Sequence, residues 1–272
     1  MNNCRIIMLG TGEATATRCY NTCFIIESGE ARLLVDAGGG NGILSQLDKA
    51  NIAITDVHDM FITHAHTDHI LGAVWVVRMI AHRIADGRYN GVLNVYGHDK
   101  VLDVLDWICR NTLTKPYLAC LNKTIILHEI KDGESFDVSG INVTAFDIHS
   151  EKEKQFGFRA VMSGGVSLVC LGDEPYNDSE RIYADGADWL MAEAFCLYAD
   201  RERFKPYEKC HSTAFDAGAS AARLNVKNLV IYHTEDTNLP ERKHRYTEEA
   251  GRSFSGQIFV PDDLDVIDIA SL

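Results

Sequence analysis

The stretch FITHAHTDHILGA, residues 61–73, places three imidazoles and one carboxylate at positions 64–69. His64 and His66 follow an apolar run, where a turn of the backbone can aim both rings at one point. Asp68 and His69 fall at the start of the next expected helix and face a neighbouring point. Packing or capping explains a single histidine well. Four potential ligands in so short a stretch instead indicate a metal site, and their spacing favours two metals.

The other ligands of such a site must come from distant parts of the chain, because a metal needs three or four protein ligands. Three candidates each follow a strand-like apolar run: His149 ends VTAFDIH, Asp173 ends VSLVCLGD and His233 ends KNLVIYH. Strand ends on one edge of a sheet gather where loops build a site on a rigid frame. We therefore expect these three residues to join the 64–69 group.

His211 stands directly before an expected helix, in the segment KCHSTAFDAGASAARL. Thr213 is placed to cap the N-terminus of that helix, with Asp216 as its capping-box partner. Taken alone, His211 is as compatible with a structural role as with a role in the site.

The composition is that of an ordinary globular protein, with 272 residues, 46% of them hydrophobic and 24% charged. No apolar run reaches the roughly 20 residues that cross a bilayer, and the first residues do not resemble a signal peptide. The eight cysteines are scattered and form no Cys-x-x-Cys pair, so we expect reduced thiols and a cytoplasmic protein. The net charge of −13 disfavours long nucleic acid and favours a small substrate.

Short apolar or β-branched segments predict strands, and amphipathic periodicity predicts helices between many of them. The expected strands are 4–9, 22–27, 31–36, 57–63, 92–96, 124–130, 141–148, 157–162, 165–171, 188–194, 227–232 and 264–269. The expected helices are about 42–50, 69–86, 98–111, 213–224 and 240–252. No linker divides the chain, so we expect residues 1–272 to form a single α/β domain of two packed sheets with helices outside.

The motif H-x-H-x-D-H, followed in order by a separate His, Asp and His, resembles the metallo-β-lactamase fold superfamily. The likeness runs from MLGTGEATATRCYNTCFII through HAHTDHILGA and LGDEPYND to MAEAF. The closing segment HSTAFDAGASAARLNVKNLVIYHTE is most similar to the ribonuclease Z-like, phosphodiesterase-like branch. The resemblance implies a four-layer αββα sandwich. It specifies the fold and the metal site much more closely than the substrate.

The resemblance also implies a two-metal centre. One ion would be held by His64, His66 and His149, and the second by Asp68, His69 and His233, with Asp173 bridging the two. Imidazole and carboxylate ligands suit Zn²⁺, while Mn²⁺ and Fe²⁺ stay open. Such a centre would lower the pKa of a bridging water and supply a hydroxide nucleophile.

The catalytic residues that the resemblance implies are Asp68, His211 and Glu193. His211 matches a histidine of the ribonuclease Z-like branch that is not a metal ligand. It would donate a hydrogen bond or a proton near the leaving group. Glu193, in MAEAF, matches the acidic residue that orients this histidine. A solvated surface acid is the alternative for Glu193.

A departure from ribonuclease Z narrows the expected substrate. Enzymes of that kind that trim transfer RNA carry a long inserted arm, in many of them between the positions matching His149 and Asp173. Residues 150–172 here predict only a turn and a hairpin. Together with the acidic net charge, this argues against tRNA 3′ processing.

Two surfaces carry open alternatives. An anionic-substrate contact and a solvated charge run both fit the basic residues ahead of His211, namely Arg201, Arg203, Lys205 and Lys209. The helix at 70–90 has apolar residues on more than one side. Either it packs wholly on the sheet, or part of it faces a second subunit of a homodimer through Val74, Trp75, Val77 and Met79.

We therefore expect a dinuclear metal-dependent hydrolase whose hydroxide attacks a phosphodiester, or a related ester, of a small substrate such as a cyclic nucleotide. A lactone, thioester or aryl sulfate ester hydrolase on the same site is the alternative. A tRNA 3′-processing endonuclease and a metal-binding scaffold without turnover are weaker ones. A diiron reductase is disfavoured because such proteins carry Glu within the leading motif, whereas His66 is intact here.

Overall fold

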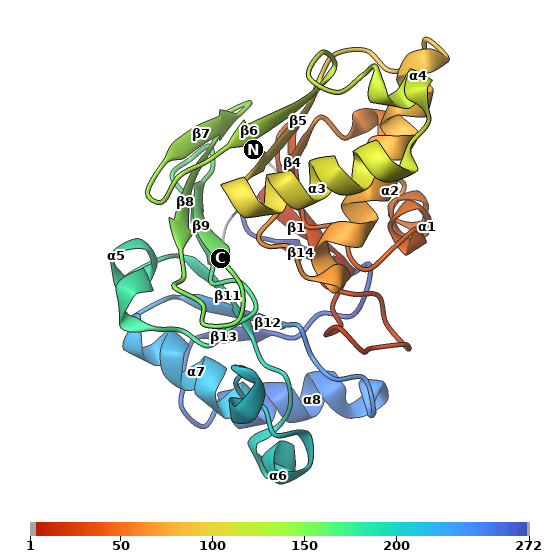
Figure 1. Ribbon diagram of the computed structural model, residues 1–272. Coiled ribbons are helices and arrows are strands. Elements are labelled where there is room, and N and C mark those ends of the chain that lie inside the picture. The colour runs from red at the N-terminus through yellow and green to blue at the C-terminus, as the bar shows by residue number, and fades with distance from the viewer. Residues whose placement is uncertain (1–3, 271–272) are drawn as a thin grey trace.

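Two seven-stranded sheets form the centre of the structure, a computed structural model that describes residues 4–270 (Figure 1). The first sheet has the order β14-β1-β2-β3-β4-β5-β6. Its strands are β1 (Cys4–Gly10), β2 (Cys23–Ser28), β3 (Ala31–Val35), β4 (Asp59–Phe61), β5 (Leu93–Gly97), β6 (Ile125–Glu129) and β14 (Val266–Asp268). The second sheet has the order β13-β12-β11-β10-β9-β8-β7. Its strands are β7 (Ser135–Val138), β8 (Ile141–Asp147), β9 (Phe156–Val161), β10 (Ser167–Cys170), β11 (Trp189–Glu193), β12 (Asn228–Tyr232) and β13 (Gln257–Phe259).

The inner strands are apolar on both faces because each face packs against another layer. In β1, Ile6 and Met8 point into the core between the two sheets, whereas Ile7 and Leu9 point into the core under the helices. Successive side chains of a strand alternate in this way. A strand buried on both faces therefore appears in the sequence as a continuous apolar run.

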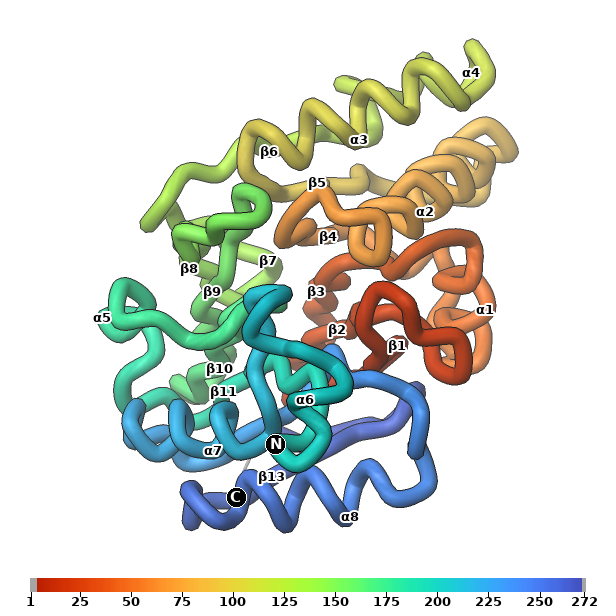
Figure 2. Tube along the Cα trace, turned by 60° about the horizontal axis from the view of Figure 1, so that its bottom comes forward, coloured from red at the N-terminus to blue at the C-terminus, as the bar shows by residue number. Residues whose placement is uncertain are grey.

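Helices cover the outer face of each sheet, as Figure 2 shows for α1, α2 and α3 on one side and α7 and α8 on the other. The helices are α1 (Gly42–Lys49), α2 (Thr67–Ala85), α3 (Asp99–Thr112), α4 (Lys115–Leu118), α5 (Arg181–Ala184), α6 (Arg201–Phe204), α7 (Ala214–Arg223) and α8 (Leu239–Ala250). Short 3₁₀ turns are η1 (Ile54–Asp56), η2 (Asp178–Glu180), η3 (Tyr198–Asp200) and η4 (Tyr207–Lys209). Among residues 4–270, no helix has the length and apolar character needed to cross a bilayer. The predicted αββα layering is confirmed.

Parallel strands bring distant loops to one edge of the sandwich. β3 and β4 are parallel neighbours in the first sheet, and β10, β11 and β12 are parallel neighbours in the second. Their carboxyl ends carry the loops that begin at residues 36, 62, 171, 194 and 233. The Phe156 N–H donates to the Thr63 carbonyl oxygen at 3.0 Å, which ties the two sheets together beside these loops. The fold thus gathers the predicted ligand segments at one place.

The elements that sequence periodicity did not predict are short ones. β7 and β13 lie at the edges of the second sheet. The sequence SFDV in β7 has only four residues, of which Val138 alone is fully buried. The helix α2 begins at Thr67 rather than 69, so that Asp68 and His69 both lie in its first turn. The predicted cap of α7 is confirmed, since Thr213 and Asp216 form a reciprocal capping box.

The predicted dimer face of α2 is wrong in one residue. Val77 is 1% exposed and belongs to the core under the helices, so it is unavailable to a second subunit. Trp75 is 37% exposed, and Val74 and Met79 are partly exposed. A homodimer through the exposed part of this face stays a prediction, which sedimentation showing only monomer would contradict.

The eight cysteines form no disulfide, and most of them are buried. Burial raises the pKa of the Cys109 thiol to about 12 and that of Cys170 to about 12. A thiol that stays protonated is a poor nucleophile and a poor metal ligand. These cysteines therefore act as small apolar side chains.

One buried carboxyl makes stability depend on pH. Glu180 is 1% exposed, and burial raises its pKa from 4.5 to about 8 although the Asn177 N–H donates to it. Between these two values the unfolded chain releases the proton while the folded chain keeps it, so the free energy of unfolding falls as pH rises. Glu180→Gln is expected to stabilise the protein at pH 8 by on the order of 1–3 kcal/mol and to change little near pH 4.5. Denaturant unfolding at both pH values measures this.

The matched control for this prediction is Glu151→Gln. Glu151 is exposed, and its substitution removes the same charge without relieving burial. An equal effect of Glu180→Gln at both pH values would show that folding does not raise the pKa of this carboxyl.

Candidate metal centre

The N-terminus of α2 aligns the motif residues. His66 occupies the N-cap position with an extended backbone, φ −65° and ψ 151°. His64 lies in the segment between β4 and α2, and its Nε2 is 2.9 Å from the Nδ1 of His66. Asp68 lies in the first turn, where the positive end of the helix dipole favours a carboxylate. The local chain path thus explains how a six-residue motif points several ligands at one region.

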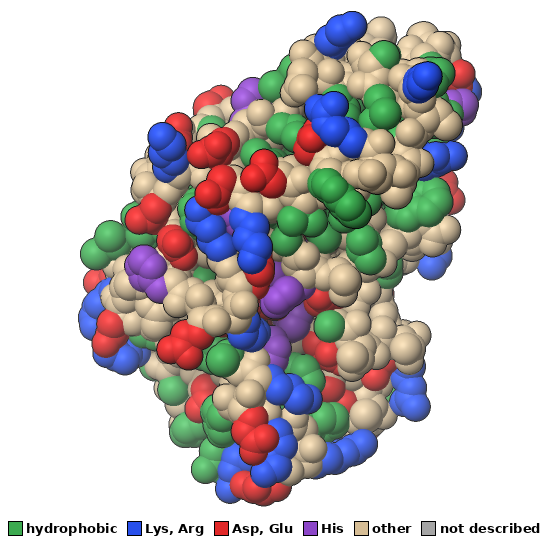
Figure 3. Space-filling model, viewed as in Figure 1, with side chains coloured by type: hydrophobic (Ala, Val, Ile, Leu, Met, Phe, Trp, Pro, Cys, Tyr) green, Lys and Arg blue, Asp and Glu red, His purple; other side chains and the backbone are tan. Residues whose placement is uncertain are grey.

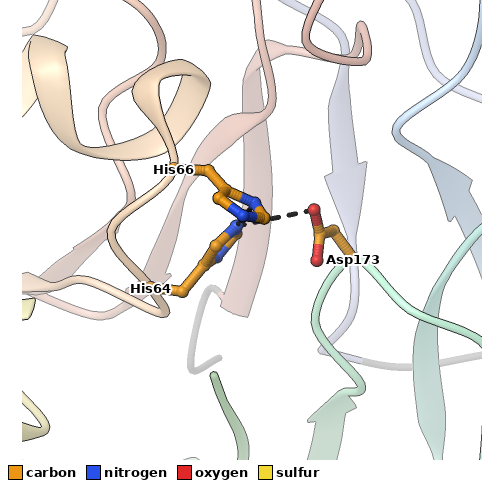
Figure 4. Close-up of side chains that lie close together, drawn as sticks. All are labelled: His64, His66 and Asp173. Carbon is orange, nitrogen blue, oxygen red and sulfur yellow. Dashed lines mark hydrogen bonds and ion pairs between the residues drawn. The ribbon is translucent and has the colours of Figure 1, made fainter. Parts of the chain in front are cut away.

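Asp173 and His233 arrive from the second sheet and complete two groups. His64, His66 and Asp173 form the first, and their arrangement is drawn in Figure 4. The second group consists of Asp68, His69 and His233. Within each group the potential ligand atoms lie within 4.8 Å of one another.

The carboxylate of Asp173 connects the two groups. Its Oδ2 is 3.5 Å from His64 Nε2 and 3.8 Å from the Nε2 atoms of both His69 and His233. In the second group, Asp68 Oδ2 is 3.3 Å from His69 Nε2 and 3.5 Å from His233 Nε2. A single carboxylate oxygen therefore lies within 4 Å of ligand atoms from both groups.

The structure does not bring His149 to these groups. It follows β8 with a left-handed backbone, φ 56°, and its side chain is 63% exposed. Its backbone N–H donates to Asp147 Oδ1 at 2.7 Å, which fixes the turn in this orientation. Asp173, rather than His149, completes the group of His64 and His66 here. The ligand role of His149 stays a prediction.

Asp36 is a buried residue beside the ligand groups that the sequence did not identify. Its Oδ2 accepts hydrogen bonds from His69 Nδ1 and from the Thr63 hydroxyl, both at 2.8 Å, and its Oδ1 accepts one from the Thr63 N–H. A carboxylate on the rear nitrogen of an imidazole fixes the ring and raises its basicity, which leaves Nε2 directed at the metal site. The available signal was an acidic residue between an apolar run and the glycines of DAGGGNG.

Close packing holds Asp36 in place. A Cβ on Gly72 of α2 would lie 1.8 Å from the Ala37 carbonyl oxygen, so only glycine permits this approach. The Ala37 N–H donates to the His69 carbonyl oxygen at 3.1 Å. The loop after β3 and the first turns of α2 therefore form one packed unit.

The residues present fit divalent cations. His69 Nε2, His233 Nε2 and Asp173 Oδ1 are buried and have no hydrogen-bond partner among the described residues. Buried polar atoms are almost always paired, so these orphaned atoms indicate a missing partner. Two carboxylates and several imidazoles form a donor set that suits zinc, manganese or iron.

The pKa shifts of Asp173, Asp68 and His64 support this fit. The pKa of His69 differs: burial would lower it, but the Asp68 and Asp36 carboxylates outweigh burial and raise it. Burial alone would raise the pKa of Asp173, but His64, His233 and His69 outweigh it and hold that pKa far below its usual value. Burial likewise acts upward on the pKa of Asp68, and His69 and His233 hold it low. Burial lowers the pKa of His64, which keeps this ring neutral. The site therefore offers ionised carboxylates and an imidazole with a free lone pair.

Glu193 and His211 form a second layer beside His233. The His211 ring stacks on His233 at 5.3 Å and on Phe195 at 5.1 Å between centroids. Glu193 Oε2 lies 3.5 Å from His211 Nδ1, and Oε1 accepts a hydrogen bond from the Ser212 N–H at 2.6 Å. Glu193 is 1% exposed, which excludes the solvated surface acid.

A pocket of about 420 Å³ opens above these residues. His66, Asp68, Asp173, His211 and His233 line it together. Figure 3 shows histidines at the bottom of a hollow near the middle of this face, with basic side chains above and below them. The volume matches sites for small molecules, which span about 300–1,000 Å³.

Comparison with known proteins identifies the family. The model described as Anti-Pycsar protein Apyc1 matches residues 4–187. The chain belongs to the Anti-Pycsar protein Apyc1 family. The match includes the predicted ligands from His64 to Asp173 and ends before Glu193, His211 and His233, so it covers most of the candidate site.

Sequence relatives and solved structures match most of the length of this Apyc1 family member. A ribonuclease Z of Mycobacterium bovis (strain BCG / Pasteur 1173P2) is 26% identical over 265 residues, covering 90% of each chain. The metallo-β-lactamase fold protein YhfI from Bacillus subtilis superposes with a TM-score of 0.79 at 18% identity, covering 98% of this chain and 99% of its own. The short form of human tRNase Z superposes with a TM-score of 0.76 at 22% identity, covering 98% and 100%. The predicted resemblance is confirmed, and the chain is a metal-dependent hydrolase of the metallo-β-lactamase fold.

Proposed function

We propose that this hydrolase cleaves a phosphodiester, or a related ester, of a small molecule such as a cyclic nucleotide. The observation that carries the proposal is the place of Asp173 Oδ2, within 4 Å of imidazoles from both ligand groups. A shared carboxylate is the arrangement that holds two cations close together. Relatives named ribonuclease Z support the phosphodiester class, because ribonucleases cleave phosphodiester bonds.

The proposed centre holds two divalent cations. His64, His66 and Asp173 would bind the first, with His149 joining by a turn of its loop, and Asp68, His69 and His233 would bind the second. Zinc is the preferred ion, and manganese or iron suits the same donors. The cations would lower the pKa of a bound water. Their positive charge would also stabilise the negative charge that develops on the substrate.

Three residues around the centre would position the attacking water and assist the leaving group. Asp68 lies in both the ligand group and the pocket wall, where it would accept a hydrogen bond from the attacking water. His211 would donate a hydrogen bond or a proton to the leaving-group oxygen. Glu193 would act through His211 by holding the orientation of its ring.

The pocket and the charge of the chain support a small substrate. A pocket of about 420 Å³ holds a molecule of nucleotide size rather than a folded RNA. The chain between His149 and Asp173 is occupied by β9, β10 and short turns, with no extended arm. The net charge of −13 would also weaken binding of a polyanion.

Substrate screening tests the proposal. The metal-loaded protein is expected to hydrolyse bis-p-nitrophenyl phosphate and cyclic nucleotides faster than an aryl sulfate, a lactone or a thioester. The same protein treated with a chelator is the control, and it should lose at least about 100-fold in rate because bound cations activate the nucleophile. Absence of activity on every diester would defeat the proposal. Faster cleavage of a sulfate, lactone or thioester would instead assign the protein to that class of hydrolase. Cleavage of precursor tRNA would instead support a tRNA 3′-processing endonuclease.

A further inference from the structure

Two lysines from separate loops line the pocket of the metal site. Lys152 comes from the loop between β8 and β9, and Lys209 ends η4 just ahead of His211. Asp68 and Asp173 also line the pocket, and each belongs to one of the two ligand groups. The two lysines are therefore positively charged residues of the pocket wall, and they are distinct from the residues that would bind metal.

Lys209 lies beside the aromatic ring that stacks on His211. Its ammonium lies 4.8 Å from the centroid of the Phe195 ring, and that ring stacks on His211. A cation over an aromatic face is attracted to the ring, which orders the side chain. Among residues 4–270, no carboxylate lies within 4 Å of this ammonium in an ion pair, so its charge is available to a ligand beside His211.

The other basic residues of the same segment are engaged elsewhere. Arg201 lies 3.9 Å over the Tyr198 ring and donates to the Tyr198 carbonyl oxygen. Arg203 lies 4.7 Å over Phe204, and Lys205 pairs with Glu202 and Glu208 at 3.9 and 3.3 Å. None of these three residues lines the pocket. The sequence alone does not decide whether these basic residues contact a substrate. In the structure, Lys209 is the one of the four that lines the pocket.

Lys152 is attached to the loop that carries Asp173. Its ammonium is 3.5 Å from Glu174 Oε1, and its side chain is 24% exposed. The Ser150 hydroxyl donates to the same Glu174 oxygen at 2.5 Å. Glu174 thus orders the loop after β8 and keeps Lys152 at the pocket wall. The pairing neutralises part of its charge, so Lys152 should attract an anion less strongly than Lys209.

We propose that Lys209 and Lys152 form an anion clamp that selects substrates with a negative charge on the ester or beside it. Ammonium groups bind phosphoryl oxygens by charge-assisted hydrogen bonds, which neutral esters cannot match. The clamp deepens the proposed function, on which its substrate assignment rests. It favours phosphodiesters over lactones and thioesters, because only the former carry a permanent charge for both lysines.

Binding of inorganic phosphate to the metal-loaded protein tests the clamp without turnover. Isothermal titration calorimetry is expected to give a roughly tenfold larger dissociation constant for Lys209→Gln than for the wild type. This is the change expected when one charge-assisted hydrogen bond is lost. Lys152→Gln should lose less phosphate affinity than Lys209→Gln, and the double variant should lose the most. The matched control is Lys205→Gln, which removes the same charge from the same segment outside the pocket.

Kinetics supply the second readout. With bis-p-nitrophenyl phosphate, Lys209→Gln is expected to raise KM roughly tenfold with a smaller change in kcat, and Lys209→Arg should restore most of the loss. Metal content measured in every variant should equal that of the wild type.

The outcomes separate the clamp from the proposed function. Lysine-dependent phosphate binding in a protein that cleaves no diester keeps the clamp and defeats the function. Diester cleavage with phosphate binding unchanged in both lysine variants keeps the function and overturns the clamp. An equal loss in Lys205→Gln, or no phosphate binding by the wild type, also overturns the clamp.

Discussion

Replacing Asp173 with asparagine is expected to remove at least one equivalent of bound metal and to lower kcat/KM by at least about 10³-fold. Asparagine keeps the shape of the side chain and removes the charge that the His64, His69 and His233 rings share. In the proposed two-metal centre the cations would repel each other, so loss of the carboxylate between them would weaken both sites. Elemental analysis of the purified variant, together with its diester kinetics, measures the effect.

Asp178→Asn is the matched control for this substitution. Asp178 lies five residues further along, and its exposed carboxylate pairs with Arg223 at 2.6 Å, away from the ligand groups. It should keep the metal content and rate of the wild type. Addition of metal should raise the midpoint of thermal unfolding in the wild type and the control, because a ligand that binds only the folded state stabilises it. An Asp173→Asn protein that keeps all its metal would exclude Asp173 from the centre.

Local spacing made much of this site predictable. His64, His66, Asp68 and His69 are close in sequence, and their side chains can meet only if the chain turns between β4 and α2, as it does. Asp173 and His233 were predicted because each follows a buried strand, and parallel strands end at the same edge of a sheet. Sequence periodicity therefore carries information about the site wherever a ligand stands at the end of a regular element.

The residues that were missed depend on contacts that periodicity does not encode. Asp36 supports His69 only because β3 and β4 pair in parallel and Gly72 lets the next loop approach α2. Lys152 reaches the pocket through a loop whose course is set by Glu174. His149 follows a predicted strand as Asp173 does, but its left-handed backbone directs the side chain to solvent. Loop conformation decides the cases of Lys152 and His149, and strand pairing together with close packing decides that of Asp36.

Replacing His211 with alanine is expected to leave the metal content unchanged and to lower kcat by about 10²- to 10⁴-fold, the range for loss of a general acid. The ring lines the pocket and stacks on His233, while Glu193 lies behind its Nδ1. Distance alone leaves a rival assignment, because Glu193, His211 and His233 also lie within 4.8 Å of one another and could bind a cation. Elemental analysis beside the kinetics separates the two roles. His244→Ala is the matched control, since His244 is exposed on α8.

Glu193→Gln extends the test to the positioning of His211. Glutamine still accepts a hydrogen bond from the Ser212 N–H but lacks the negative charge that lies 3.5 Å from His211 Nδ1. A loss of about 10- to 100-fold is expected, as for other carboxylates behind an active histidine. In the double variant with His211→Ala, the Glu193 substitution should add almost no further loss, since it acts only through that ring. Additive losses would instead give Glu193 a role of its own, and loss of metal from His211→Ala would make His211 a ligand.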